Sequence, residues 1–299
     1  MAIPLKKEKL RELYDLQAKT RGAIRWTDEG FKDQHLLFTQ TIIGYLNTAR
    51  LKKIESLIRY AFCHNSLKGD SRVVLDLGCA EGFHTNKLSK MGLSYVVGSD
   101  ISRVRLKRGN AKKNIRTTYL LCDAEHLPFQ DEAFDFVLCS EVLEHLPQPV
   151  SCLYEVSRIL DQDGQLILTT PSSKSYVEKR SVHLPLLSIS CDLETIMGRF
   201  LRFLLRKHKN RTVDKKIQIF EAYIEHVNLM DYKNFKAILK TCNLEIEMHQ
   251  WSGFYVPFIP MTILLNISPK SISFLEKFFA SAKPEPFLWT MLVYARKRS

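Results

Sequence analysis

The chain has 299 residues, of which 45% are hydrophobic and 25% charged, and its formal net charge is +12. The composition is ordinary for a globular protein, and the length fits one large α/β domain with an insertion or two smaller domains. The positive charge favours anionic partners such as nucleic acid, phospholipid headgroups or phosphorylated substrates, although a basic surface that contacts only water explains it equally well.

Cysteine usage and apolar segments predict a cytoplasmic protein without a transmembrane helix. The seven cysteines include no Cys-x-x-Cys pair and no zinc-like spacing, as expected in a reduced compartment. The first residues, MAIPLKKEKLRELYDLQ, are charged and lack an apolar secretory core. The longest apolar stretch, 254–267, is interrupted by Pro257 and Pro260 and is shorter than the about twenty residues that a spanning helix needs.

In chain order, the pattern predicts helices first and then an alternation of strands and helices. Residues 5–65 are expected to be helical, because LKKIESLIRYAF places its apolar residues on one stripe at the helical period. From residue 72 onward, apolar runs alternate with helices expected near 83–91, 102–114 and 149–160. These runs are RVVLDLG, YVVGSD, TYLLCD, FDFVLCS and GQLILTTP. Apolar strands separated by helices are typical of a parallel sheet covered on both faces.

The alternation stops at Pro171 and resumes with a helix and a strand in DYKNFKAILKTCNLEIEMHQW. A final strand is predicted in FLWTMLVYARKRS at the end of the chain. We therefore expect a helical N-terminal segment, 1–65, and one sheet domain, 66–299. An insertion at about 171–230 is expected to lie above the sheet.

Glycines and acids mark the ends of the first three predicted strands. Asp76, Gly78 and Gly82 lie between a buried strand and a helix, where glycine lets a ligand approach the backbone. The spacing differs from the dinucleotide pattern G-x-G-x-x-G, and the acidic loop favours a cationic ligand over a pyrophosphate. Asp100 and Asp123 end the next two strands, where a carboxylate can accept hydrogen bonds from ribose hydroxyls. A tight turn without a ligand is the alternative for the first loop.

These stretches resemble a known enzyme family. VVLDLGCAEGFHT, VVGSD, LLCDAEHLPFQDEAFDFVLCSEVLEHL and GQLILTTP occur in the order and spacing of class I S-adenosylmethionine-dependent methyltransferases. Residues 72–170 are most similar to the branch that contains ubiquinone and menaquinone biosynthesis methyltransferases. The resemblance implies a Rossmann-like, seven-stranded, mostly parallel α/β sheet whose last strand, LWTMLVYAR, is reversed. The insertion would then form a lid.

The same resemblance implies that the cofactor is S-adenosyl-L-methionine. Asp76, Gly78 and Gly82 would surround its methionine moiety, Asp100 would hold the ribose, and Asp123 would frame the adenine. The full set of expected cofactor-binding residues is Asp76, Gly78, Cys79, Ala80, Gly82, Asp100, Ile101, Asp123, Ala124 and Ser140. Ala80 departs from the family, because many members have glycine there, and we expect it to tighten the loop without abolishing binding.

Methyl transfer from a sulfonium requires an aligned nucleophile and, for a hydroxyl, removal of a proton. The candidate catalytic residues are Glu141, His145 and His226, since histidine titrates near neutral pH and SEVLEHL follows the fourth strand. Glu141, Glu144, His145 and His226 also resemble the divalent-metal site of small-RNA 3′-end 2′-O-methyltransferases. Such a set suits Mg²⁺, Mn²⁺ or Zn²⁺. The alternative is that Glu144 and His145 only cap the following turn.

Two segments indicate contact with a lipophilic partner. TIMGRFLRFLLRKHKNR (195–211) places arginines and apolar residues on separate helical stripes, which suits a membrane surface or a lid over a lipophilic substrate. The apolar stretch 254–267 would form a wall or an interfacial loop. For both segments, packing into the core is the alternative.

We therefore predict a cytoplasmic S-adenosylmethionine-dependent methyltransferase that modifies oxygen or carbon of a small, lipophilic or lipid-like acceptor. The apolar segments are also compatible with peripheral contact with a membrane. An RNA ribose 2′-O-methyltransferase is the first alternative, motivated by the net charge and the Glu/His quartet. Nucleic acid is less favoured, because basic and aromatic residues do not interleave as in single-strand grooves. A non-catalytic, cofactor-binding regulatory protein is the further alternative.

Overall fold

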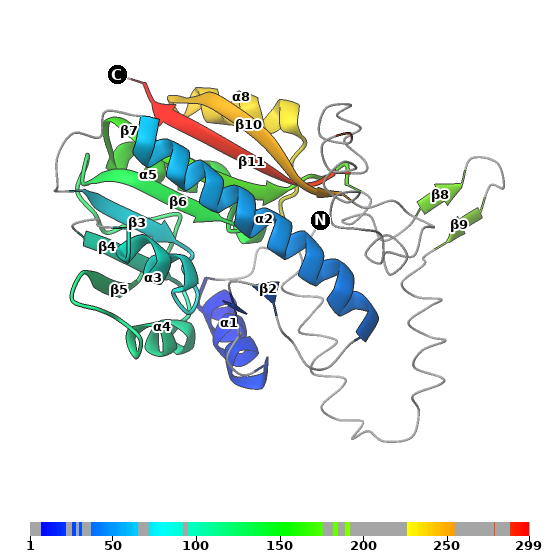
Figure 1. Cartoon of the computed structure of the whole chain (residues 1–299), viewed down its shortest axis with the longest axis horizontal. Coiled ribbons are helices and arrows are strands. Elements are labelled where there is room, and N and C mark those ends of the chain that lie inside the picture. Colours follow the sequence, from blue (N-terminus) through cyan, green and yellow to red (C-terminus); the bar gives the residue numbers. More distant parts are fainter. Residues whose placement is uncertain are drawn as a thin grey trace.

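The computed structural model describes residues 7–21, 26–27, 30–31, 37–64, 72–91, 95–175, 182–184, 189–191, 226–254, 278 and 288–298. Its centre is a seven-stranded sheet with the strand order β10-β11-β7-β6-β3-β4-β5 (Figure 1). The strands of this sheet are β3 (Val73–Leu77), β4 (Tyr95–Asp100), β5 (Thr117–Leu121), β6 (Phe134–Ser140), β7 (Leu160–Pro171), β10 (Leu244–Phe254) and β11 (Leu288–Lys297). Two small sheets pair β1 (Trp26–Thr27) with β2 (Gly30–Phe31) and β8 (Val182–Leu184) with β9 (Ile189–Cys191).

Five neighbouring strands of the large sheet are parallel. β3 pairs in parallel with β4 and β6, β4 pairs with β5, and β6 pairs with β7. β11 runs antiparallel to both β7 and β10. The prediction of a mostly parallel sheet with a reversed last strand is therefore confirmed. Because the carboxyl ends of the parallel strands lie at one edge, that edge is where an open α/β sheet binds its ligands.

One face of the sheet is covered by α2 (Leu37–His64) and α3 (Phe83–Ser89) (Figure 1). The stripe predicted on α2 is buried, and it packs against alternate residues of the strands. The buried α2 residues are Ile54, Leu57, Ile58 and Ala61, and their partners on the sheet include Val74, Phe136, Leu138, Ile167 and Tyr294. Full burial of one such side chain contributes about 1.5–3 kcal/mol, so α2 is a part of the core.

The other face is covered by α5 (Pro149–Ile159) and α8 (Tyr232–Thr241). Leu153, Val156, Phe235 and Leu239 of these helices pack in one cluster with the strand residues that point to this side. The sheet is thus the middle of three layers, as the continuous apolar strands predict. Two further helices lie near the carboxyl edge, namely α4 (Arg103–Asn110), with α1 (Lys7–Arg21) packed against it. The single turn η1 (Leu143–His145) follows β6.

The predicted insertion at about 171–230 is described only in part. Its two ends meet where Ser172 pairs with Met230, and β8 and β9 form a hairpin within it. The segment 195–211 lies outside the described residues, as does 254–267 except for the last residue of β10. Among the helices that the structure describes, none combines the length and the apolar character needed to span a membrane.

Candidate active site

The loop after β3 has an unusual backbone. Gly78, Ala80 and Gly82 all have positive φ angles, of 73°, 49° and 77°. A Cβ atom on Gly78 would lie 2.3 Å from Val142 Cγ2, and one on Gly82 would lie 1.9 Å from Tyr119 Oη. Packing within the protein therefore requires glycine at both positions, whether or not a ligand is bound.

Asp100, the last residue of β4, holds this loop in place. Its Oδ2 accepts a hydrogen bond from the Ala80 amide (2.9 Å), and its Oδ1 accepts one from the Ser102 amide (2.8 Å). The side chain is buried, and that burial raises its pKa, while the Arg105 guanidinium acts in the opposite direction. A carboxylate oxygen has two lone pairs, so each oxygen of Asp100 has capacity for a further donor such as a ribose hydroxyl.

Asp76 and Glu81 differ from what the sequence suggested. Asp76 is buried in β3, and its Oδ2 accepts a hydrogen bond from Thr85 Oγ1 (2.6 Å) in the first turn of α3. Burial raises the pKa of Asp76 to about 7. Glu81 forms an ion pair with Arg108 (2.8 Å), so its negative charge is compensated within the protein. The loop is therefore less anionic than its sequence alone indicates.

The remaining expected cofactor residues lie at the same edge of the sheet. Cys79 is buried, and its amide donates to Ser99 O (2.8 Å). Asp123, beyond β5, accepts a hydrogen bond from the Glu125 amide (2.9 Å). Ser140, the end of β6, shares a hydrogen bond with Thr169 Oγ1 (3.0 Å). Two half-buried residues complete the set, Ile101 and Ala124.

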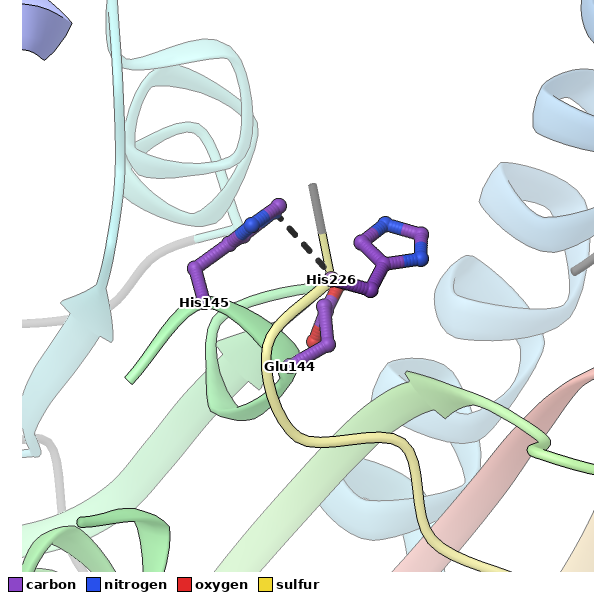
Figure 2. Close-up of side chains that lie close together, drawn as sticks. All are labelled: Glu144, His145 and His226. Carbon is purple, nitrogen blue, oxygen red and sulfur yellow. Dashed lines mark ion pairs between the residues drawn. The ribbon is translucent and has the colours of Figure 1, made fainter. Parts of the chain in front are cut away.

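Three of the four expected metal ligands come together. Glu144 and His145 belong to η1, whereas His226 comes from the segment that leads back to α8, and Figure 2 shows their side chains converging. One ligand atom from each lies within 4.8 Å of the others. His145 Nε2 is 3.8 Å from Glu144 Oε1, and the two imidazole ring centroids are 5.2 Å apart.

The cluster contains buried polar atoms without protein hydrogen bonds. Glu144 is fully buried, and its Oε2 accepts a long hydrogen bond from Thr170 Oγ1 (3.3 Å), but Oε1 has no hydrogen-bond partner. Burial and the nearby Glu141 raise the pKa of Glu144. His145 Nδ1 is also buried without a hydrogen-bond partner. Burial, with a smaller effect of His226, lowers the pKa of His145 to about 3. His145 is therefore a neutral imidazole that can accept a proton or bind a metal ion.

Backbone hydrogen bonds explain how His226 reaches a residue so distant in sequence. The amides of Val227 and Asn228 both donate to Glu144 O, at 2.7 and 3.1 Å. The Asn228 side-chain amide also donates to Leu146 O. The returning segment is thus attached to η1 itself. Asn228 was not predicted from the sequence, in which its only signal is its position two residues after a candidate histidine.

Glu141 lies outside this cluster. Its Oε2 forms a 2.6 Å ion pair with Arg50 of α2, and its Oε1 accepts a hydrogen bond from Thr169 Oγ1 (2.9 Å). The Arg50 guanidinium also lies over the Trp289 ring, 5.4 Å from its centroid. Arg50 was not anticipated either, because nothing in the local pattern of α2 indicates which strand end it reaches.

Two comparisons with known proteins identify the central part of the chain. A family model described as a methyltransferase domain matches residues 75–168. The structure is similar to that of the magnesium protoporphyrin IX methyltransferase of Synechocystis, solved with bound S-adenosylhomocysteine, with a TM-score of 0.56 and 16% identity over 98% of this chain and 100% of that chain. The chain carries a class I S-adenosylmethionine-dependent methyltransferase domain.

Curated relatives of the methyltransferase domain act on different classes of substrate. The tRNA U34 carboxymethyltransferase of Nautilia profundicola is 30% identical over 120 residues, which are 38% of this chain and 39% of that protein. The ubiquinone biosynthesis O-methyltransferase of Alkalilimnicola ehrlichii is 32% identical over 123 residues, 39% of this chain and 49% of that protein. The match thus spans at most about half the length of these relatives, and it supports the methyltransferase domain without distinguishing between their acceptors.

Proposed function

We propose that this protein is an S-adenosylmethionine-dependent methyltransferase that modifies an oxygen or carbon atom of a small, lipophilic acceptor. One observation carries the proposal: a nucleoside-type carboxylate, Asp100, and a cluster of a carboxylate and two imidazoles occupy the same edge of one methyltransferase domain. Helix α1 contacts both regions: the Tyr14 ring packs edge to face on His145, and Asp15 accepts a hydrogen bond from Ser102, whose amide donates to Asp100. The binding of the cofactor and the chemistry would therefore take place side by side.

The residues at the ends of β3, β4 and β5 fit S-adenosylmethionine. Asp100 has hydrogen-bond capacity for both ribose hydroxyls, and Asp123 and Ala124 follow the next strand, where the adenine would lie. Asp76, Gly78, Cys79, Ala80 and Gly82 would surround the methionine moiety, Ile101 would lie beside the nucleoside, and Ser140 would lie near the methyl group. The cofactor supplies a methyl group on a positively charged sulfur, and this charge would favour the ionised forms of Asp76 and Asp100 over the neutral forms that burial favours.

His145 is the proposed general base for an acceptor hydroxyl. An imidazole nitrogen would take the proton that the acceptor hydroxyl loses on methylation, and the cofactor, when bound, would supply the methyl group and leave as a neutral thioether. Burial keeps His145 neutral, but its pKa of about 3 also makes the imidazole a weak base. The role therefore requires that the bound cofactor and acceptor, together with Glu144, raise this pKa toward neutral. His226 is the alternative base, with its ring beside that of His145. Glu144 Oε1, 3.8 Å from His145 Nε2, would stabilise the imidazolium that forms.

The same cluster has the donors for a divalent ion such as Mg²⁺, Mn²⁺ or Zn²⁺. The buried Glu144 Oε1 without a hydrogen-bond partner is the observation that supports this fit. Burial alone favours the neutral carboxyl group, and a bound cation would stabilise the charged form and compensate its charge. Glu144, His145 and His226 would hold the ion, whereas Glu141 is occupied by Arg50. A bound ion would acidify an acceptor hydroxyl.

The similarity to a ubiquinone biosynthesis O-methyltransferase supports a small, lipophilic acceptor. A lipophilic acceptor would also suit a cytoplasmic enzyme with peripheral membrane contact. Because the chain is also similar to a tRNA-modifying enzyme, RNA is the alternative class of acceptor that the experiment must distinguish.

The decisive experiment uses S-adenosylmethionine with a labelled methyl group and a fractionated cell extract. We expect label in a lipid fraction with the wild-type protein, and none with His145→Ala, although that variant should still bind S-adenosylhomocysteine. Label in RNA, with transfer that falls steeply as salt is added, would instead indicate that the acceptor is a nucleic acid and not a small molecule. Cofactor binding without label in any fraction would favour a regulatory protein.

A further inference from the structure

The N-terminal helix α1 is attached to the start of α4, beside the proposed cofactor site. Asp15 Oδ1 accepts hydrogen bonds from Ser102 Oγ (2.5 Å) and from the Val104 amide (3.1 Å). Arg108 donates to Ala18 O (2.9 Å) with the same guanidinium that pairs with Glu81. Ser102 is also the residue whose amide donates to Asp100. Ser102 therefore links Asp15 of α1 to Asp100, the carboxylate proposed to bind the ribose. Arg108 likewise links Ala18 of α1 to Glu81.

This attachment places Tyr14 next to the reaction cluster. The Tyr14 ring meets the His145 ring edge to face, with centroids 6.2 Å apart and an interplanar angle of 83°. The Arg105 guanidinium lies 5.4 Å from the centroid of the Tyr14 ring. Tyr14 is thus packed between a cation of α4 and an imidazole of η1, and the desolvation there raises its pKa, so the phenol stays protonated at neutral pH.

The orientation of His145 lacks its usual support. A functional histidine is commonly held by a hydrogen bond from its second ring nitrogen to a carboxylate or a backbone carbonyl. In His145, Nδ1 is buried without such a partner. The Glu144 contact to Nε2 is 3.8 Å long, too long for a hydrogen bond. Among the described residues, the rings of Tyr14 and His226 make aromatic contacts with the imidazole.

We propose that Tyr14 is a positioning residue: the contact between its ring and that of His145 fixes the imidazole for methyl transfer, and α1 forms a wall of the reaction pocket. This inference rests on the proposed function. Edge-to-face aromatic pairs have a preferred geometry, and small displacements of a reacting group reduce rates strongly. Tyr14 acts through His145, so its loss should change turnover more than cofactor affinity.

The experiment compares three single variants of the full chain. Tyr14→Phe keeps the ring and removes the hydroxyl, Tyr14→Leu removes the ring, and Glu12→Ala alters an exposed position of the same helix. We expect kcat to stay within about twofold of the wild type for Tyr14→Phe and Glu12→Ala. For Tyr14→Leu, we expect a kcat that is lower on the order of 10–100-fold, with little change in the Kd for S-adenosylhomocysteine.

A spectroscopic measurement tests the contact without any acceptor. In ¹H–¹³C spectra of the histidine rings, with the His145 signal assigned from His145→Gln, that signal should shift in Tyr14→Leu and stay close to wild type in Tyr14→Phe. Asp15→Ala gives a second test that leaves Tyr14 in place. This substitution should release α1, and faster hydrogen exchange of residues 7–21 would show the release. The His145 signal should then shift as well.

Two results would overturn the positioning role. The first is an unshifted His145 signal in both Tyr14→Leu and Asp15→Ala, and the second is an equal loss of kcat in Tyr14→Phe and Tyr14→Leu, which would make the hydroxyl the important group. Failure of the proposed function is a separate outcome. In that case, the wild-type protein would show no methyl transfer, although the histidine signals still respond to Tyr14.

Discussion

The two halves of the candidate site are built in different ways. The expected cofactor contacts come almost entirely from one continuous segment, between Asp76 and Ala124, on three adjacent strands. The reaction half combines η1 with His226, and it is bordered by Tyr14 of α1 and by the ion pair between Glu141 and Arg50 of α2. One half is therefore local in sequence, and the other is assembled from separate parts of the chain.

The hydrogen bonding of the two halves differs as well. In the cofactor half, the Asp100 carboxylate is bound by two backbone amides, and Asp76 is bound by Thr85. In the reaction half, two atoms of the proposed reacting groups, Glu144 Oε1 and His145 Nδ1, are buried without hydrogen-bond partners. The cofactor half also contains such atoms, for example Ser99 Oγ and Glu81 Oε2, but these belong to residues outside the expected cofactor-binding set. Buried polar groups are nearly always paired in proteins, so an exception needs a reason such as a missing ion, water or substrate. The difference suggests that variants of the first half will change affinity and variants of the second will change turnover.

The largest effect is expected in the reaction half. If a divalent ion binds at Glu144, His145 and His226, a chelator should abolish methyl transfer, and Glu144→Gln should reproduce the loss in untreated protein. The amide keeps the shape of the side chain and can still accept from Thr170, but it cannot compensate a cation. Initial rates with labelled cofactor would measure both effects, with Glu247→Gln on β10 as the matched control. Full activity in chelator would end the metal proposal and leave His145 as the base.

In the cofactor half, Asp100→Ala should weaken binding of S-adenosylhomocysteine without changing the rate of methyl transfer once the cofactor is bound. Loss of hydrogen bonds to a charged carboxylate costs on the order of 1.5–3 kcal/mol, which corresponds to roughly 10–150-fold in Kd at 1.4 kcal/mol for each factor of ten. Calorimetry would measure the change. Asp131→Ala is the control, since this exposed residue pairs with Arg158 on another part of the molecule. An unchanged affinity would remove Asp100 from the ribose site.

The sheet could be predicted well because the sequence patterns that indicate its strands each lie within a few consecutive residues. The central parallel strands β3, β4 and β6 are mainly apolar runs, and their burial needs no information from distant residues. The buried stripe of α2 was predicted for the same reason, since helical periodicity shows which side is covered. The ends of elements were less certain, and α4 ends at Asn110, before the expected residue 114.

The reaction half was predicted less completely because its contacts are long in range. Periodicity shows that one face of α1 or α2 is buried, but not that Tyr14 meets His145 or that Arg50 meets Glu141. The pairing of Glu141 with Arg50 separates it from the three residues with which it was expected to act. His226 was recognised only through a family resemblance, whereas its actual attachment depends on backbone hydrogen bonds to Glu144.

A different kind of effect concerns the stability of the cofactor half as a function of pH. The pKa of Asp76 is about 7 in the folded protein and near 3.9 in an unfolded chain, so the folded state binds more protons between these values. The free energy of unfolding should therefore decrease as the pH rises from about 4 to 7, by at most about 1.4 kcal/mol for each pH unit from this group. Asp76→Asn should flatten that part of the curve. Denaturant unfolding at several pH values tests it, and identical slopes in the two proteins would contradict the shift.

The smallest effect is expected at Ala80, where the chain departs from the glycine of many family members. Its φ of 49° lies in the left-handed region, which costs a residue with a Cβ roughly 1–2 kcal/mol. Ala80→Gly removes this cost, but the greater freedom of glycine in the unfolded chain offsets part of the gain. We expect a net stabilisation of up to about 1 kcal/mol, measured by denaturant unfolding. Asn243→Gly, at a φ of 57° beyond α8, should gain less, because asparagine tolerates this region. Cofactor affinity should not change, since Ala80 contacts Asp100 through its backbone amide. A less stable Ala80→Gly protein would instead show that the methyl group of Ala80 packs favourably in the loop.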